Sequence, residues 1–248
     1  MQIPDDWQPR EDLLKERIIL VTGAGNGIGA AVAKSYAQYG ATVILLDKIV
    51  RNLEQVYDAI ESAAGVQPAI YPMNLEGASE KDYLDLAATI EKEFGRLDGL
   101  LHNAAMLGAL IPIAHFDSEL WYKILQVNLN APFLMTSACL NLLAQSKDAS
   151  ILFSSDSAGR RGKAYWGAYA ISKAATENFM QVLADEMETN TSIRVNSLDP
   201  GPVATAFRSL AYPGENPERI ARPEEVVAPH LYLIGPDSKG VTGKQFCL

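Results

Sequence analysis

The chain contains few of the residues that bind metals or form disulfides, with two cysteines and three histidines among 248 residues. Cys139 and Cys247 do not have the spacing of metal ligands, and His102, His115 and His230 form no HExxH-like pattern. Cys139 lies in an apolar helical stretch and is expected to be a small core residue. We therefore expect no metal site and a reduced, cytoplasmic protein.

Positive charge and long apolar runs are also scarce. The chain has 21 Lys and Arg against 30 Asp and Glu, for a net charge of −9. This balance disfavours sequence-independent nucleic-acid binding, which needs cations to replace the counterions of the phosphates. No apolar run approaches the roughly 18 residues of a membrane span, and the N-terminus lacks the apolar segment of a signal peptide. We expect neither a nucleic acid nor a membrane as partner.

Apolar strand-like runs alternate with amphipathic stretches along the whole chain, without a linker or an internal repeat. This alternation predicts an α/β fold, a doubly wound parallel sheet in a three-layer αβα sandwich. We expect one domain over residues 17–248, preceded by an arm at 1–16 in which Trp7 and Pro9 contact the body. The expected strands are 17–21, 41–46, 69–72, 97–102, 150–154, 193–198 and 245–246. One expected helix follows the glycine-rich loop and ends at Gly40. The other expected helices cover 53–64, 79–94, 117–145, 168–188 and 223–234.

A glycine-rich loop follows the first strand and opens the first helix, which is typical of a Rossmann-type dinucleotide site. Gly23 permits a tight turn, Gly27 lets the backbone approach a pyrophosphate, and Gly29 allows close packing of helix on strand. Asp47 ends the second strand, where a carboxylate accepts from the adenosine-ribose hydroxyls and repels a 2′-phosphate. Lys48 and Arg51 partly offset that repulsion. The sequence thus predicts NAD, with NADP as the less favoured alternative.

Residues 149–173 hold the groups most suited to proton transfer. Tyr169 and Lys173 are four apart in an expected helix and so share one face. Upstream, the strand 150–154 ends in a run of serines and an aspartate at 154–157. Ligands of open α/β sheets bind at the carboxyl ends of the strands, so these groups should meet in one site.

Five motifs together resemble the short-chain dehydrogenase/reductase family. They are TGAGNGIG at 22–29, HNAA at 102–105, Asn128, the Tyr169 and Lys173 pair, and PGPVAT at 200–205. The resemblance covers about residues 17–245. It implies an oxidoreductase that transfers a hydride between a nicotinamide cofactor and a carbonyl or alcohol substrate.

The resemblance also implies a role for each matching residue. Tyr169 would be the proton donor or acceptor, and Lys173 would lower the pKa of Tyr169 and hold the nicotinamide ribose. Asn128 would kink its helix and support a water-mediated proton relay to Lys173. A homodimer or homotetramer would form through the helices at 117–145 and 168–188. The implied cofactor-binding residues are Gly23, Asn26, Gly27, Ile28, Gly29, Asp47, Asn74, Leu75, Asn103, Ala104, Ala105, Tyr169, Lys173, Pro200, Gly201, Val203 and Thr205.

Asp156 departs from the family pattern, because a catalytic serine normally lies thirteen residues before the tyrosine. An ionised carboxylate cannot donate a hydrogen bond to the substrate oxygen, and it would raise the pKa of Tyr169. Three alternatives remain open: a protonated Asp156, replacement of the donor by Ser155 or Ser157, or weak or absent activity. The alternative function is therefore a dinucleotide-binding protein with little or no catalysis.

The substrate pocket is expected beside this site. Its walls should come from residues after Asn103, from 160–166, and from a lid near 204–222 that excludes water. A basic cluster near the mouth of the pocket is formed by Arg160, Arg161 and Lys163. These side chains are either solvated surface residues or attract an acidic substrate. The expected apolar wall residues are Met106, Leu107, Leu110, Tyr165, Trp166, Phe207 and Tyr212.

Overall fold

A seven-stranded parallel sheet forms the centre of the computed structural model, which describes residues 1–248. The strand order is β3-β2-β1-β4-β5-β6-β7, so the sheet is built outward in both directions from β1. Its middle strands are buried along nearly their whole length because their apolar runs are covered on both faces. The strands are β1 Ile18–Thr22, β2 Thr42–Asp47, β3 Ala69–Pro72, β4 Gly99–His102, β5 Ser150–Ser154, β6 Arg194–Asp199 and β7 Gln245–Cys247.

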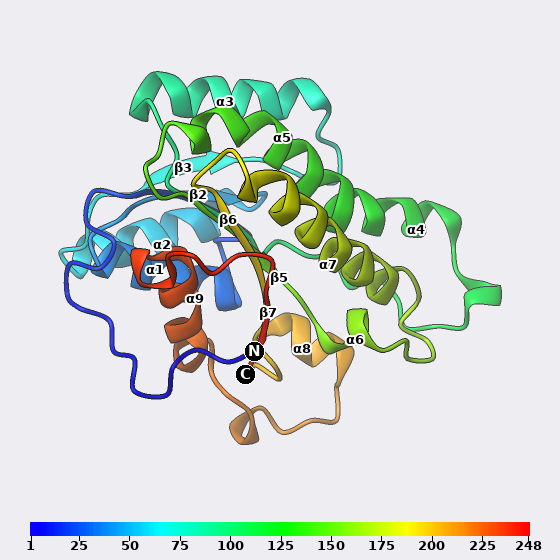
Figure 1. Cartoon of the computed structure of the whole chain (residues 1–248). Helices are drawn as coiled ribbons and strands as arrows, with labels where there is room; N and C mark the ends of the chain where they lie inside the picture. The colour runs from blue at the N-terminus through cyan, green and yellow to red at the C-terminus, as the bar shows by residue number, and fades with distance from the viewer.

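Helices cover both faces of the sheet, which confirms the predicted three-layer fold (Figure 1). On one face lie α1 Gly27–Gln38, α2 Val50–Ser62 and α9 Val227–Ile234, whose apolar residues share a core with the sheet. On the other face lie α3 Glu80–Phe94, α5 Ala131–Ala144 and α7 Gly167–Glu188. Cys139 is fully buried in this second core, as expected. The two layers cover the faces of the sheet and leave its strand ends free to form a site.

The long helix expected at 117–145 is one continuous helical run with a change of geometry in its middle. It consists of α4 Ser118–Leu125, a five-residue π-helical turn η2 Gln126–Asn130, and α5. By length and composition alone, Ser118–Ala144 is apolar enough to cross a membrane, contrary to the expectation that no run approaches that size. Met135, Cys139 and Leu142 of this run are buried in the core beside α3, as in the core helix of a folded domain.

Two short helices were not predicted from the sequence. α6 Ser157–Arg160 begins after Asp156, whose Oδ1 accepts from the Ala158 N–H at 2.7 Å. α8 Ala206–Ala211 begins after Thr205, whose Oγ1 accepts from the Arg208 N–H at 3.1 Å. Both have the aspartate or threonine N-cap that favours helix initiation. The segment from 200 to 222, for which no helix was predicted, is therefore partly helical.

The arm at residues 1–16 begins beside β7 and packs along the body. The Met1 carbonyl accepts from the Cys247 N–H at 3.0 Å, so both termini lie together at this sheet edge (Figure 1). Trp7 Nε1 donates to Asp237 at 2.9 Å and its ring packs edge-on against Tyr232. Leu13 and Leu14 are buried beneath α1 and α9. These contacts attach the arm to the domain at several points.

Two buried histidines should make the fold sensitive to acid. Burial lowers the pKa of His102 to about 3 and that of His230 to about 4. Both values lie below the ordinary 6.5, so the unfolded chain binds more protons as pH falls below about 6.5. The free energy of unfolding should therefore be highest above that pH and decrease by about 2 kcal/mol per histidine at about pH 5.

Urea unfolding between about pH 7 and pH 5 checks this expectation. His102→Phe should reduce the loss of stability over that range by about half. His115 is exposed, so His115→Phe is the matched control and should retain the full pH dependence. An unchanged pH dependence in His102→Phe would contradict the assignment of His102 as a buried neutral side chain.

Candidate active site

The carboxyl ends of β1, β4, β5 and β6 open into one pocket that runs from the glycine loop to α8. This is the sheet edge at which α/β proteins bind ligands. Fifteen of the predicted site residues line it, from Gly23 at one end to Tyr169 and Lys173 at the other. They are Gly23, Asn26, Gly27, Ile28, Asp47, Asn103, Ala104, Ala105, Asp156, Tyr169, Lys173, Pro200, Gly201, Val203 and Thr205.

The glycine loop leaves room for a ligand at the start of α1. Gly23 and Gly27 have φ of +66° and +51°, a conformation that favours glycine. A Cβ at Gly27 would point at Thr205, across the mouth of the pocket, at 3.1 Å. Gly29 lies beneath the loop, where a Cβ would come within 2.1 Å of the Gly23 carbonyl oxygen. The free N–H groups of α1 therefore face a cradle that fits a pyrophosphate.

Asp47 lies at the end of β2 with its carboxylate held by the backbone. It accepts from the Gly25 N–H at 3.3 Å and from the Ile49 N–H at 3.2 Å. A second hollow beside it is lined by Asp47, Lys48, Asn74 and Leu75. Asn74 Oδ1 accepts from the Glu76 N–H at 3.2 Å, leaving its amide nitrogen free. The hollow continues the main pocket past Gly23 and has the polar and apolar walls that suit an adenosine.

Asn103 and Thr22 fix the glycine loop to β4. Thr22 Oγ1 accepts from the N–H groups of Asn103 and Ala104, both at 3.0 Å. Asn103 Nδ2 donates to the Thr22 carbonyl at 3.2 Å. A Cβ on Gly23 would lie 3.0 Å from the Ala104 Cα, so the HNAA segment passes directly against the loop. In this chain the HNAA segment therefore holds the glycine loop in place.

Asn128 is buried in the π-helical turn and holds neighbouring segments together. Its Oδ1 accepts from the Met106 N–H at 2.7 Å, and its Nδ2 donates to the Met106 carbonyl and to Ser172 Oγ, both at 3.0 Å. Its backbone carbonyl accepts from Thr176 Oγ1 at 3.2 Å. The residue therefore positions α7 next to the strand-end loop after β4, and its side chain bonds Ser172 rather than Lys173.

Tyr169 and Asp156 are joined by a hydrogen bond in the pocket floor. Tyr169 Oη donates to Asp156 Oδ2 at 3.0 Å. Burial, followed by the neighbouring Asp156 charge, holds the pKa of Tyr169 well above its usual range. The resemblance implied a lower pKa through Lys173, whereas the departure at Asp156 predicted a higher one, and the higher one is found. The difference arises because Tyr169 is buried against a carboxylate, whereas Lys173 Nζ lies 5.7 Å from the tyrosine ring centroid.

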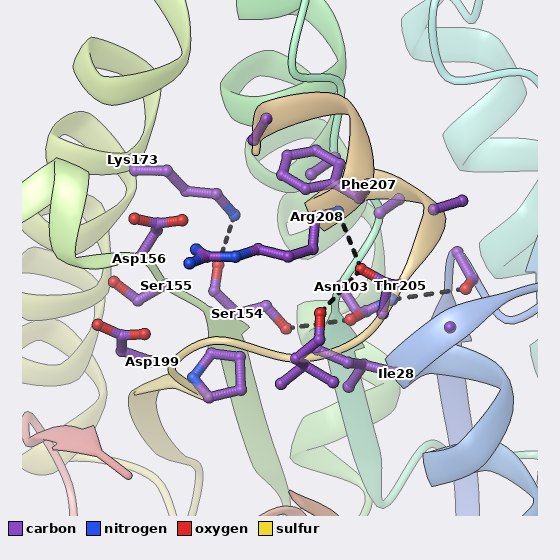
Figure 2. A pocket seen from close by; sticks show the side chains of 18 of the residues that line it. Ile28, Asn103, Ser154, Ser155, Asp156, Lys173, Asp199, Thr205, Phe207 and Arg208 are labelled. Atoms are coloured by element: carbon purple, nitrogen blue, oxygen red, sulfur yellow. Dashed lines mark hydrogen bonds between the residues drawn. The ribbon is translucent and has the colours of Figure 1, made fainter. Parts of the chain in front are cut away.

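Lys173 is buried beside the same floor and donates to the Ser154 carbonyl at 2.6 Å (Figure 2). Burial lowers its pKa to about 8, while Asp156, Asp199 and Glu177 act in the opposite direction. Lys173 is thus a cation that can lose its proton near neutral pH. Its ammonium has further donors available for a ligand beside Ser154.

The serines near Asp156 are bonded elsewhere. Ser155 Oγ donates to the buried Glu177 carboxylate, which also accepts from Ser197 Oγ at 2.7 Å. Ser157 Oγ donates to Asp156 Oδ1 at 3.4 Å. Asp156 stands where the family has its hydrogen-bond donor, and neither serine supplies a donor at that position.

Asp199 is a pocket residue that the sequence reasoning missed. It ends β6 and, with Asp156, places a second carboxylate in the floor (Figure 2). Burial raises its pKa, although the Gly201 N–H donates to it at 2.9 Å. Its position could have indicated a site residue, because it is an acidic residue at the end of a strand, directly before Pro200-Gly201.

One wall of the pocket is aromatic. Trp166, Phe207 and Tyr212 line the pocket around Tyr169, as predicted for the substrate side. Arg208 of α8 also lines it, with Nε and Nη2 bonded to Glu215 at 2.6 and 2.7 Å and its guanidinium stacked 3.7 Å from the Tyr212 centroid. These contacts join α8 to the segment that directly follows it. Tyr165, by contrast, is exposed and does not line the pocket.

The basic residues at 160–163 do not form one cluster. Arg160 bonds the Phe246 carbonyl at 3.0 Å and pairs with Glu177 at 3.6 Å. Lys163 donates to Tyr212 Oη at 3.0 Å and lies over the rings of Trp166 and Tyr212. Arg161 is exposed at the outer rim. Two of the three cations thus hold parts of this chain together.

The geometry fits a dinucleotide laid across the strand ends, and comparisons with known proteins agree with that fit. The oxidoreductase YciK of Escherichia coli K12 is 45% identical over 240 residues, 97% of this chain and 94% of YciK. A short-chain dehydrogenase from Shigella flexneri 2a complexed with NADP superposes with a TM-score of 0.93 at 44% identity, covering 96% of this chain and 99% of that one. One from E. coli CFT073 complexed with NADPH gives 0.93 at 46%, with the same coverage.

The family described as short chain dehydrogenase matches residues 17–216, most of the domain that carries the pocket. The glycine loop, the HNAA segment, Asn128, Tyr169 and Lys173 all lie within this match. With the matching fold and sequence relatives, this shows that the chain belongs to the short-chain dehydrogenase family of oxidoreductases.

Proposed function

We propose that the chain transfers a hydride between a nicotinamide cofactor and a polarised double bond of a small molecule, with Tyr169 moving the proton. The resemblance to the family predicted a carbonyl or alcohol substrate, which contains one such double bond in its oxidised form. The observation that carries the proposal is a single pocket that joins the glycine loop to Tyr169 and Lys173. The bound cofactor would supply the hydride.

The protein's own groups perform the remaining tasks. The N–H groups of α1 would hold the pyrophosphate, and Asn74 and Leu75 would flank the adenine. Lys173, fixed on the Ser154 carbonyl, would donate to the nicotinamide ribose, and Val203 and Thr205 would contact the carboxamide. Asn128 would position α7, which carries both Tyr169 and Lys173. Trp166 and Phe207 would exclude water from the reacting atoms.

For the cofactor we propose NADP(H), with NAD(H) also accepted. Two similar structures are complexed with NADP or NADPH, which favours NADP. Asp47 favours NAD, as the sequence predicted, but its carboxylate is held by the backbone N–H groups of Gly25 and Ile49. Lys48 beside it and Arg51 in α2 supply positive charge for a 2′-phosphate. These opposed effects should leave weak discrimination.

Removal of the Asp47 charge should therefore sharpen the preference for NADP. In Asp47→Ala we expect kcat/KM for NADPH relative to NADH to rise by about tenfold, which corresponds to about 1.4 kcal/mol. The measurement compares both cofactors under one set of conditions with the same substrate. Asp58→Ala, at an exposed position of α2, is the control for net charge. A ratio that does not rise in Asp47→Ala would contradict this account.

The pKa of Lys173 predicts a pH dependence of hydride transfer. With a pKa of about 8, the ammonium is present below that pH and is lost above it. We therefore expect kcat to fall as pH rises above about 8. The Asp156 charge raises the pKa of Lys173, so in Asp156→Asn the decrease should begin at lower pH. A decrease that moves to higher pH in Asp156→Asn would contradict the assignment to Lys173.

A second candidate function follows from the bond between Tyr169 and Asp156. The Tyr169 hydroxyl donates its hydrogen bond to the Asp156 carboxylate, so it is not free to donate to a ketone oxygen as the resemblance implies. A dinucleotide-binding protein with little catalysis is therefore the alternative. Steady-state oxidation of NADPH across carbonyl and C=N compounds distinguishes the two. Turnover of at least one class supports the enzyme, whereas tight NADPH binding without turnover of either supports the alternative.

The assembly and the location stay predictions. Phe133 of α5 and Ile171 and Val182 of α7 are about half exposed. These apolar side chains support a homodimer or homotetramer through the two helical runs. We propose a cytoplasmic location on the sequence grounds given above.

A further inference from the structure

The floor of the pocket presents hydrogen-bond acceptors where a carbonyl reductase needs donors. Tyr169 has one hydroxyl proton, and that proton points at Asp156 Oδ2. The lone pairs of Tyr169 Oη therefore remain free to accept from a ligand. Asp156 itself accepts at both carboxylate oxygens and has nothing to donate as a carboxylate. The pair that should receive a substrate oxygen is thus arranged for a substrate N–H.

The other hydroxyl groups of the floor do not reverse this arrangement. Ser155 Oγ is bonded to Glu177, behind the pocket, and Ser157 Oγ to Asp156. Ser154 Oγ donates to Asn103 Oδ1 at 3.4 Å, toward the cofactor side of the site (Figure 2). No serine hydroxyl therefore stands in for the missing donor beside Tyr169.

The charges of the floor also favour a cation. Asp156 and Asp199 both line it, and Lys173 is a buried cation of the same floor. Arg208 faces the same space, but Glu215 neutralises its charge through two hydrogen bonds. Lys163 and Arg161 lie farther out, and Lys163 is bonded to Tyr212. Arg208 is paired with Glu215 and Arg160 with Glu177, so these two pairs leave no net charge. The carboxylates of Asp156 and Asp199 then face only the ammonium of Lys173, so the site lacks one positive charge.

We infer that the substrate carries its reacting double bond as a protonated C=N group, as in a cyclic imine. This inference rests on the proposed function and names the substrate class of the same pocket. The iminium N–H donates to Asp156 Oδ2 or Tyr169 Oη, and its charge lies beside the two carboxylates. Trp166, Phe207 and Tyr212 provide flat apolar walls for a ring around the C=N group.

The reaction balances without any further reagent. The hydride adds to the carbon of C=N–H⁺, the π pair becomes the lone pair on nitrogen, and the products are a secondary amine and the oxidised cofactor. Because the nitrogen arrives protonated, no negative charge develops beside Asp156. A ketone would instead develop an alkoxide there, which the carboxylate repels.

Two probes of similar shape test this inference. They are 3,4-dihydroisoquinoline, a cyclic imine, and 1-tetralone, a bicyclic ketone, each assayed with NADPH. The protein variants are the natural chain, Asp156→Asn, which retains an N-cap side chain for α6, and Asp156→Ser, which restores the family's donor. Asp58→Asn controls for net charge. Binding of the cationic product, tetrahydroisoquinolinium, is measured by calorimetry in the presence of NADP, so it does not depend on turnover.

We expect the natural chain to reduce the imine with a kcat/KM at least about tenfold above that for the ketone. Asp156→Ser should reverse this order, and Asp156→Asn should weaken amine binding by about tenfold or more. Preference of the natural chain for the ketone would overturn the inference and leave the proposed oxidoreductase standing. Unchanged amine affinity in Asp156→Asn would also overturn it. Amine binding that depends on Asp156, without reduction of either probe, would support the pocket's charge preference and count against the proposed function.

Discussion

Tyr169→Phe should abolish most hydride transfer to a carbonyl compound while leaving the cofactor site intact. The substitution removes one oxygen from a side chain that is 4% exposed, without changing its volume in the aromatic wall. Positioned proton transfer contributes about 10² to 10⁴-fold to a rate, so we expect kcat for a carbonyl substrate to fall by that factor. A C=N group that arrives protonated needs no proton from Tyr169, so its kcat should fall less. NADPH affinity should change little, because the glycine loop and the adenosine hollow do not include Tyr169.

Stopped-flow measurement of NADPH oxidation, with a separate binding titration, checks this prediction. Tyr122 of α4 is the matched control because it is the same residue type and 69% exposed. Tyr122→Phe should behave as the natural chain does. Retention of most of the rate in Tyr169→Phe would mean that the proton moves through another group, and Asp156 would be the first to examine.

Gly29→Ala should damage both the cofactor site and the stability of the domain. The added Cβ would lie 2.1 Å from the Gly23 carbonyl oxygen and 2.6 Å from Asn103 Nδ2. Backbone cannot yield as a flexible side chain does, so the loop must shift away from α1. We expect a loss of about 3 kcal/mol in the free energy of unfolding and a loss of at least about tenfold in NADPH affinity.

Urea unfolding and NADPH titration measure the two effects on one protein sample. Gly77→Ala is the control, because a Cβ there meets nothing within 4 Å and its φ is not positive. It should retain natural stability and affinity. Normal NADPH binding by Gly29→Ala would show that the loop does not form the pyrophosphate cradle.

Much of the fold was predictable because its elements follow simple local rules. The apolar strands, such as Ile18–Thr22, are buried by helices on both faces, so they appear as continuous runs in the sequence. Glycines of the loop after β1 are required by backbone conformation and close approach, which fixes their spacing. The short helix α8 was not predicted because it is only six residues long and lies between Pro202 and Pro213, although Thr205 had the N-cap signal.

The site was predictable as a set of positions but not as a set of hydrogen bonds. Tyr169 and Lys173 share a helix face, so their proximity followed from spacing. The hydrogen bond from Tyr169 to Asp156, and the burial that raises the pKa of Tyr169, depend on α7 packing beside the end of β5. Asp199 lines the same pocket as Asp156 because β6 pairs with β5, and therefore no local pattern connects the two residues.

The most direct test of the central claim follows a deuterium atom from the transferable position of NADPH into a product by mass spectrometry. The natural chain should transfer the label to a carbonyl or C=N compound in a single turnover, and Tyr169→Phe should bind NADPH but transfer almost none to a carbonyl compound. If the natural chain binds NADPH and yet labels no member of either class, the chain is not a hydride-transferring enzyme for these substrates. The pocket would then be a dinucleotide-binding site alone.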